Sequence, residues 1–505
     1  MLAFGLQPTQ KTLGGPRMKA LIVDLNNFSR YPTLSVGYLS AILKAADIEV
    51  ETLSPLFFGV HGFPRRTREP AGLHMLKIAN HIGATSSNPL IGKLHTFAKR
   101  LGGGTPVDDT AVIVESFNKM LKSDIDVVLV SAYTMYFSAT KKIAEICAQR
   151  NTPLLVGGNM FVVPDIARTW ADIPGVTAVF AGEPEKILVQ LVSDISAGKS
   201  VAGCPGITTR DSIAPPAPPL QNLDDVPFPD FSAFPWECYP NRIVPIMTGR
   251  GCEWARCTFC SDVLTSAGRQ YRSRSLANVL AEIRYQREKH NVDLFVFLDL
   301  KLNSDVELWR GLAREIPRIA PGIKWTASVH VDSRKDNGLS REDLQAAADA
   351  GLARITCGLE SGSQAILNSM KKGVKLDRLS QFIRDAHAAN LSVRLTSIIG
   401  DPEEEARDID ETTRFLNSHA DEVERVVVNR FALAPNTPAT NQLAATETDF
   451  ISLLDLDKTS SLIPHTNKRF GEFRHIKAVY RLLRIANQIN RKPLIAHAAP
   501  FEGAF

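Results

Sequence analysis

Strand-like and helix-like segments alternate in two separate series along this chain of 505 residues. The first series starts with the apolar run "KALIVDL" (19–25), and the second extends over about residues 241–440. Short apolar runs between turn signals predict buried strands, and the amphipathic stretches between them predict helices. Strands that alternate with helices indicate parallel α/β sheets. We therefore expect two such sheets in two domains, which also agrees with the length of the chain.

The first series predicts a Rossmann-like domain over residues 18–200, preceded by a loose extension at residues 1–17. An irregular, basic insertion at about residues 55–110 interrupts it. Ligands of doubly wound sheets lie at the carboxyl ends of the strands. The residues predicted at those ends are Asn26, Asn27, Ser131, Tyr133, Thr134, Gly157, Gly158, Asn159, Gly182 and Glu183.

A proline-rich linker at residues 201–240 leads into the second series, because proline at this density continues neither a helix nor a sheet. Strands of the second series are predicted at 242–248, 294–300, 323–329, 354–360, 392–400 and 425–433. Six β/α units over residues 241–440 predict a partial or complete barrel with its chemistry at the strand ends. Residues 441–505 have helical periodicity and a basic face, which predicts a packing helix with a solvated side, or a lid.

The composition sets a few limits on partners and location. A net charge of +4 on this length argues neither for nor against a nucleic-acid partner, and no apolar run is long enough to cross a membrane. The first 17 residues lack the apolar segment of a secretory signal. Seven cysteines, an odd number with three close together, suit a reducing cytoplasm better than a disulfide framework. We therefore expect a cytoplasmic protein with no membrane contact.

Three cysteines, Cys252, Cys257 and Cys260, lie in the short segment "GRGCEWARCTFCSD" (249–262), directly after the first predicted barrel strand. A zinc site would need a fourth ligand, for which Cys238 is the nearest candidate. A redox Cys-x-x-Cys pair and three inert cysteines are further interpretations. Thiolates also suit iron–sulfur chemistry, and three of them hold a [4Fe–4S] cluster with one iron left for another ligand.

A three-cysteine loop after the first barrel strand, with the aromatic Phe259 before its last cysteine, resembles the radical S-adenosylmethionine (SAM) superfamily. The resemblance implies that SAM chelates the fourth iron, and that its reductive cleavage gives a 5′-deoxyadenosyl radical. Four residues separate Cys252 from Cys257, whereas the commonest pattern in that family has three. The loop is therefore a variant of that pattern, with one additional residue between its first two cysteines.

Further segments carry the same resemblance in the expected order. The stretch "GLESGSQAILNSMKKG" (358–373) implies that Glu360 and Ser361 lie near SAM, and "SIIGDPEEEARD" (397–408) implies adenine contacts at Ile399 and Gly400. The stretch "FVFLDLKLNSD" (295–305) implies that Asp299 stands close to the SAM amino group.

An α/β domain in front of such a barrel resembles the cobalamin-binding domain of the B12-dependent radical SAM class. Gly157 and Gly158 would let the backbone approach the nucleotide tail of cobalamin, and Ser131 and Thr134 would offer hydroxyls to it. The absence of an Asp-x-His-x-x-Gly motif predicts that no histidine supplies the lower cobalt ligand. A different nucleotide-binding domain, or one without a ligand, is the alternative.

The resemblance implies a class B radical SAM methyltransferase that methylates an unactivated carbon of a natural product or peptide through methylcobalamin. His330 and Arg394, predicted at barrel strand ends, would position the substrate, relay a proton or serve the fold. A flavodoxin or ferredoxin would donate the electron. The alternatives are a radical rearrangement or ring contraction without methyl transfer, and a cobalamin- or metal-binding sensor.

Overall fold

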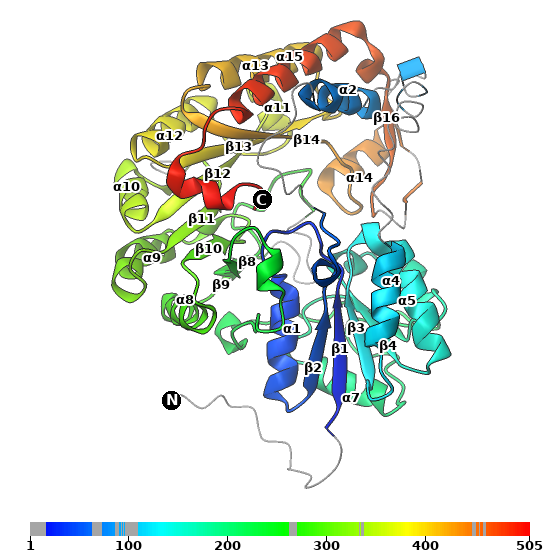
Figure 1. The fold of residues 1–505 in the computed structure, drawn as a ribbon. Coiled ribbons are helices and arrows are strands. Elements are labelled where there is room, and N and C mark those ends of the chain that lie inside the picture. The colour runs from blue at the N-terminus through cyan, green and yellow to red at the C-terminus, as the bar shows by residue number, and fades with distance from the viewer. Residues whose placement is uncertain are drawn as a thin grey trace.

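The computed structural model describes residues 17–62, 73–85, 90–91, 93, 95, 110–261, 270–332, 334, 338–446, 451–453, 455–457 and 461–504. Two six-stranded sheets organise the chain, one in each of the two series of the sequence (Figure 1). Both sheets are predominantly parallel, so the structure confirms the predicted α/β fold class.

The first sheet has the strand order β2-β1-β3-β4-β5-β6. Its strands are β2 (Glu49–Leu53), β1 (Lys19–Asp24), β3 (Val127–Ser131), β4 (Leu154–Gly157), β5 (Ala178–Phe180) and β6 (Ile207–Thr208). The first five are parallel, and β6 pairs with β5 in the antiparallel direction. Apolar residues fill both faces of this sheet, as a parallel sheet requires.

Helices cover both faces of the first sheet. Ala20 and Ile22 of β1 join the core beneath α1 (Leu34–Ala45) and α7 (Leu188–Ser196). Leu21 and Val23 point the other way, into a second core. That core is formed with α4 (Thr110–Met120), α5 (Phe137–Gln149) and α6 (Pro164–Ala171). The alternation follows from the two-residue period of a strand.

The second sheet has the order β14-β13-β12-β11-β10-β7, and all its pairings are parallel. Its strands are β14 (Val423–Arg430), β13 (Ser392–Ile399), β12 (Leu352–Glu360), β11 (Lys324–Val329), β10 (Leu294–Phe297) and β7 (Ile243–Ile246). Helices follow its outer rim in Figure 1. They are α8 (Leu276–His290), α9 (Val306–Ile319), α10 (Arg341–Asp349), α12 (Leu376–Ala388) and α13 (Ala406–Ser418). This is the predicted partial (β/α)6 barrel.

The segment between the domains packs against both of them. Phe231 of this segment is fully buried against α1. Its ring lies so close to Gly37 that a Cβ added to Gly37 would be only 2.5 Å from it. On the barrel side, the side-chain amide of Gln286 in α8 donates a hydrogen bond of 2.8 Å to the carbonyl of Pro229. The proline-rich segment is therefore part of the packing between the domains.

The C-terminal region contains more than the predicted helices. Along the chain, an antiparallel pair of strands, β15 (Ile451–Leu453) and β16 (His465–Asn467), follows α14 (Pro438–Ala445) and precedes α15 (Phe473–Asn490). The insertion, predicted to be irregular, contains the helix α2 (Leu73–Thr85), which lies beside α15 (Figure 1).

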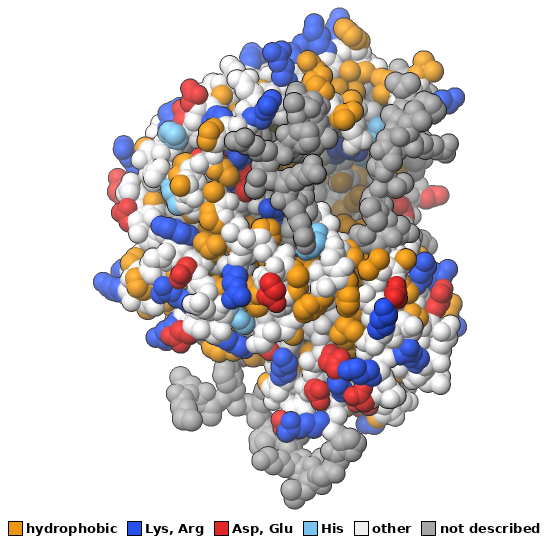
Figure 2. All heavy atoms as spheres, viewed as in Figure 1, with side chains coloured by type: hydrophobic (Ala, Val, Ile, Leu, Met, Phe, Trp, Pro, Cys, Tyr) orange, Lys and Arg blue, Asp and Glu red, His pale blue; other side chains and the backbone are white. Residues whose placement is uncertain are grey.

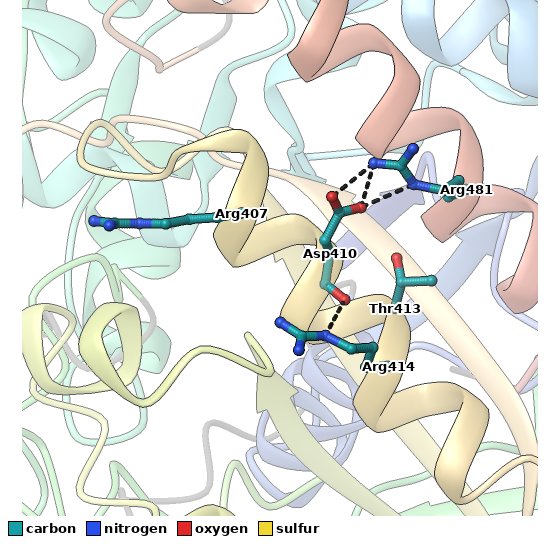
Figure 3. Close-up of a pocket in the computed structure, with 5 residues that line it drawn as sticks. All are labelled: Arg407, Asp410, Thr413, Arg414 and Arg481. Atoms are coloured by element: carbon teal, nitrogen blue, oxygen red, sulfur yellow. Dashed lines mark hydrogen bonds and ion pairs between the residues drawn. The ribbon is translucent and has the colours of Figure 1, made fainter.

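The basic side chains of α15 are largely solvated, as predicted for one face of a packing helix. Lys and Arg side chains gather at the top of the molecule in Figure 2, where α13 and α15 lie. Figure 3 shows Arg481 of α15 turned toward Asp410 of α13, with N–O distances of 2.6 and 2.9 Å. None of the helices in the described part of the chain is both long enough and apolar enough to cross a bilayer.

After α15, the chain enters the concave side of the barrel. Phe501 and Ala504 pack there against Ile243 of β7, Val296 of β10 and Ala353 of β12. The side chain of Asn490 pairs with both backbone groups of Val426 on β14, at 2.7 and 2.8 Å. The side chain of Asn241, just before β7, donates to the carbonyl of Pro500. Asn490, the last residue of α15, thus pairs backbone groups of the edge strand β14, and the tail packs against the other edge strand, β7.

Buried charge holds this tail in place. The Arg354 side chain of β12, which is 2% exposed, donates to Ser392, to the carbonyl of Phe501 and to the carboxylate of Glu502, at 3.1 to 3.2 Å. Arg425 of β14 binds the other oxygen of Glu502 at 2.9 Å.

Arg394 belongs to this layer as well. It is the third residue of β13, so it lies near the start of the strand and not at its carboxyl end, where the sequence had placed it. Burial and the neighbouring Arg354 lower the pKa of Arg394 to about 10. The prediction was wrong because the apolar run that it relied on starts several residues before the strand reaches the carboxyl edge.

We expect Arg354→Met to lower the free energy of unfolding by about 2–3 kcal/mol, because it leaves the buried Phe501 carbonyl and one oxygen of the Glu502 carboxylate without their donor, although Arg425 still binds the other oxygen. The matched control Arg481→Met breaks the α13–α15 ion pair, whose side chains are 39% and 36% exposed, and should cost less than about 1 kcal/mol. Denaturant titration with limited C-terminal proteolysis checks this. Equal losses in the two variants would contradict the role given to Arg354.

Candidate active site

The cysteine loop leaves β7 at the carboxyl edge of the barrel. Its first residues form β8 (Gly249–Arg250), which pairs with β9 (Arg272–Ser273). Gly251 has a φ of +88° and passes so close to the carbonyl of Gln270 that a Cβ would collide with it. Cys252, Cys257 and Cys260 follow, each half-buried, and none of the seven cysteines of the chain forms a disulfide. The end of the quoted segment, at Asp262, lies outside the described residues.

Asp299, two residues beyond β10, fixes the base of this loop. Its buried carboxylate accepts hydrogen bonds from the amides of Thr248 and Gly249, at 3.1 and 2.8 Å, and from the Thr248 hydroxyl at 2.7 Å. Burial raises the pKa of Asp299 to about 6, although these hydrogen bonds oppose the rise. Asp299 thus lies at the carboxyl edge of the barrel, as predicted, and binds the residues directly before the cysteines.

Glu360 ends β12 with a left-handed φ of +56° and turns its carboxylate toward Lys372. The ammonium of Lys372 lies 2.7 Å from Glu360 and 5.9 Å from the centre of the Phe259 ring. Burial lowers the pKa of Lys372, but the charges of Glu360, Cys257 and Cys260 outweigh it and raise the pKa overall. A buried cation therefore lies beside the cysteines, which no sequence pattern had marked.

Three further predicted residues lie at the carboxyl ends of β12 and β13. Ser361 is fully buried, and its hydroxyl contacts Thr412 at 3.3 Å, so it is turned into the core. Ile399 ends β13, and Gly400 follows with a φ of +91° and donates its amide to the buried Glu404 at 2.7 Å. The backbone at this strand end is thus held in a fixed turn by a carboxylate from the following loop.

His330 directly follows β11, as predicted. Its Nε2 lies 2.8 Å from the carbonyl of Lys372, and its ring centre lies 5.4 Å from that of Trp254. Burial, with the charges of Lys372 and Lys301, lowers the pKa of His330 to about 3, so the ring is neutral at physiological pH. His330 follows the carboxyl end of β11, whereas Arg394 lies near the start of β13, so the two residues are not neighbours in one site.

The carboxyl edge of the first sheet is aligned by its parallel register. Asp24 pairs with Ser131, Ser131 with Gly157, and Gly157 with Phe180. In the order β2-β1-β3-β4-β5 the connections reverse direction between β1 and β3, which is where such sheets bind ligands. The register thus brings Ser131 and Gly157 together at that edge.

The remaining predicted residues follow β3 and β4 directly. Tyr133 stacks edge-on against Phe28 at 5.3 Å, and Thr134 begins a short 3-10 turn. A Cβ on Gly157 would meet no atom within 4 Å, whereas one on Gly158 would lie 2.8 Å from the carbonyl of Ala132. Asn159 begins the next turn. The edge therefore has open space in front of Gly157.

Gly182 and Glu183 lie where the domains meet. Gly182 has a φ of +109° and forms a bridge with Ala217 of the linker. The carboxylate of Glu183 accepts hydrogen bonds from Arg272 at 3.0 Å and from the Leu220 amide at 2.9 Å, and it pairs with Arg250 at 2.9 Å. Arg250 lies two residues before Cys252, so the cysteine loop and the carboxyl end of β5 are in direct contact.

The chemistry of the three thiols suits an iron–sulfur cluster, although the described residues bring no three Cys, His, Asp or Glu side chains together as the ligands of a single metal ion. Three half-buried thiols share one loop, and burial raises the pKa of Cys257 while the nearby Lys372 lowers it. The Tyr271 hydroxyl and His330 Nδ1 are buried and have no hydrogen-bond partner among the described residues. Buried polar atoms of this kind usually face a ligand or water. The open edge at Gly157 likewise leaves room for a ligand at the first sheet.

Residues 246–416 match the family model described as the radical SAM superfamily. Together with the barrel and its cysteine loop, this match makes residues 246–416 a radical SAM domain, and that family implies a [4Fe–4S] cluster and SAM.

Most of the chain is similar in fold to two solved structures. It superposes on the radical S-adenosylmethionine methyltransferase TsrM from Kitasatospora setae with a TM-score of 0.65, at 16% identity over 93% of this chain and 91% of that one. The cobalamin-dependent S-adenosylmethionine radical enzyme OxsB also gives a TM-score of 0.65, at 16% identity over 89% of this chain and 64% of that one. These likenesses extend the shared fold to the first domain.

Curated relatives match parts of the chain. An uncharacterized methyltransferase of Pyrococcus horikoshii is 27% identical over 61% of this chain and 66% of its own length. The cytidylyl-2-hydroxyethylphosphonate methyltransferase of Streptomyces wedmorensis is 26% identical over 46% and 49%. The anaerobic magnesium-protoporphyrin IX monomethyl ester cyclase of Rubrivivax gelatinosus is 25% identical over 57% and 54%. The chain thus spans about half to two thirds of the length of these relatives.

Asp24, fully buried at the edge of the first sheet, gives a pH-dependent prediction. Burial raises its pKa from 3.8 to about 7, so the folded state binds this proton more tightly than the unfolded state. The free energy of unfolding therefore falls as the pH rises from about 4 to 7, by up to about 1.4 kcal/mol per pH unit from this group. In Asp24→Asn this contribution disappears.

Urea unfolding of both proteins at several pH values between 4 and 8 measures the difference. The control is Asp47→Asn, which changes an exposed carboxyl on the same domain and should keep the slope of the wild type. If Asp24→Asn also keeps that slope, Asp24 does not titrate in this range.

Proposed function

We propose that this protein is a cobalamin-dependent radical SAM methyltransferase that methylates an unactivated carbon. The observation that carries the proposal is the contact of Arg250, beside the cysteine loop, with Glu183 and Glu185 after β5. It joins the two ligand-binding edges of the fold, so groups bound at both would face a common substrate. Pockets often form between domains in this way.

Each edge would hold one group. Cys252, Cys257 and Cys260 would bind the cluster, and the segments at Glu360 and Gly400 would lie against SAM. The first sheet would bind cobalamin at Ser131, Thr134, Gly157 and Gly158. When bound, the cluster with SAM supplies a carbon-centred radical, and cobalamin supplies the methyl group. The chain itself positions these groups and excludes water.

The relatives support methyl transfer, because two of them carry methyltransferase names. The likeness to the fold of TsrM and OxsB supports cobalamin at the first sheet. The substrate of this chain is proposed to be a natural-product intermediate or a short peptide. A flavodoxin or ferredoxin is proposed as the electron donor, since the cluster must be reduced from outside.

A second candidate is a radical reaction without methyl transfer. It is favoured by the similarity to the anaerobic magnesium-protoporphyrin IX monomethyl ester cyclases, one of which matches 57% of this chain. Turnover products separate the two candidates. Carbon methylation by two SAM molecules forms S-adenosylhomocysteine and 5′-deoxyadenosine together, whereas cyclisation forms only the latter.

Anaerobic purification with iron and cobalamin quantitation tests the proposal. The wild type should contain about four irons and about one cobalamin per chain. Cys257→Ala should lose most of the iron, because one thiolate ligand is gone, and should keep cobalamin on the first domain. The control Cys204→Ala changes a half-buried cysteine at the start of the linker and should keep both.

A wild type that binds cobalamin but no iron would contradict radical chemistry and favour a sensor. A wild type that binds iron but no cobalamin would contradict methyl transfer from cobalamin.

A further inference from the structure

The residues that lengthen the cysteine loop make specific contacts with the barrel. Glu253 follows Cys252 and pairs with Lys301 at 3.0 Å. The side chain of Lys301 is 1% exposed and also pairs with the buried Asp332 at 2.8 Å. Lys301 thus joins an exposed residue of the loop to a carboxylate in the interior.

The next residue, Trp254, provides a second contact. Its Nε1 donates a hydrogen bond of 3.0 Å to the carbonyl of Lys371. Its ring lies directly against Gly373, where an added Cβ would collide with it. The guanidinium of Arg256 lies 5.1 Å above the ring. Ala255, between them, takes a φ of +42°, which lets the chain turn back toward Cys257.

Both contacts with the first half of the loop come from one strand end. Asp299 binds Thr248 and Gly249, which precede Cys252, and Lys301 binds Glu253, which follows it. Cys252 is therefore held on both sides by residues that directly follow β10. Trp254 then ties the loop to the segment after α11 (Gln364–Ser369), which carries Lys372.

The Glu253–Lys301 pair contributes little to stability, because the Glu253 side chain is 49% exposed and such pairs are worth about 1 kcal/mol or less. Its effect is on position. One additional residue between two cluster ligands adds freedom to the first, and two anchors at successive residues remove it. Outer contacts of this kind orient metal ligands.

We propose that Glu253 and Trp254 are positioning residues that hold Cys252 in a single geometry despite the longer spacing to Cys257. This inference rests on the proposed cluster of the preceding subsection. It gives a role to two residues between Cys252 and Cys257 that would position a ligand without binding the cluster themselves.

The test uses the anaerobically prepared full-length protein, with Glu253→Gln, Trp254→Ala and Trp254→Phe. Glu253→Gln and Trp254→Ala should release iron to an external chelator about tenfold faster than the wild type. Their reduced clusters should give broadened or multiple electron paramagnetic resonance signals, because the Cys252 sulfur takes more than one position. Trp254→Phe keeps the ring against Gly373 and should restore a single signal.

Glu307→Gln is the matched control, since it breaks the exposed Arg310–Glu307 pair on α9 and should leave iron release unchanged. Circular dichroism melting curves confirm that each variant is folded. The inference is overturned if Glu253→Gln and Trp254→Ala release iron at the wild-type rate with the wild-type signal. If the wild type itself binds no cluster, the proposed function fails and this inference falls with it.

Discussion

The ion pairs of Glu183 with Arg250 and Arg272 connect the first domain to the barrel. Their charged side chains are between 9% and 18% exposed, so they lie mostly out of water and need each other as partners. Arg250 and Arg272 belong to the β8–β9 pair that frames the cysteine loop, and Glu183 belongs to the carboxyl edge of the first sheet. The position of the loop relative to the first domain therefore depends on this network.

For the residues of this network, the position could be predicted from the sequence but the contact partners could not. Gly182 and Glu183 could be placed at a strand end from the sequence, because a short apolar run and a glycine mark where the strand stops. Their partners could not, because Arg250, Arg272 and Leu220 are distant in sequence and follow no period. Asp299 is similar: its place after a buried strand was evident, but its hydrogen bonds to the amides of Thr248 and Gly249 arise only when β7 and β10 pair.

Other features had no signal in the sequence. Lys372 is one lysine among several on a loop, and it becomes a site residue only because Gly358 leaves room for its contact with Glu360. Arg394 was misplaced because a buried arginine inside an apolar strand has the same local pattern as one at its end. The course of residues 495–504 into the barrel follows from tertiary packing of Phe501 and Ala504, which periodicity does not report.

A barrel of six strands leaves two edge strands, and the C-terminal region of this chain contacts both of them. Asn490 satisfies β14, Asn241 links the tail to the start of β7, and Phe501 fills the concave side between them. These contacts lie near the beginnings of the strands, beside Arg354 and Arg425. The opposite ends carry the cysteine loop and meet the first domain through Arg250. The tail also meets the first domain, because Tyr31 of that domain packs against the cluster that contains Phe501, so the two domains are joined at the tail as well as through Arg250.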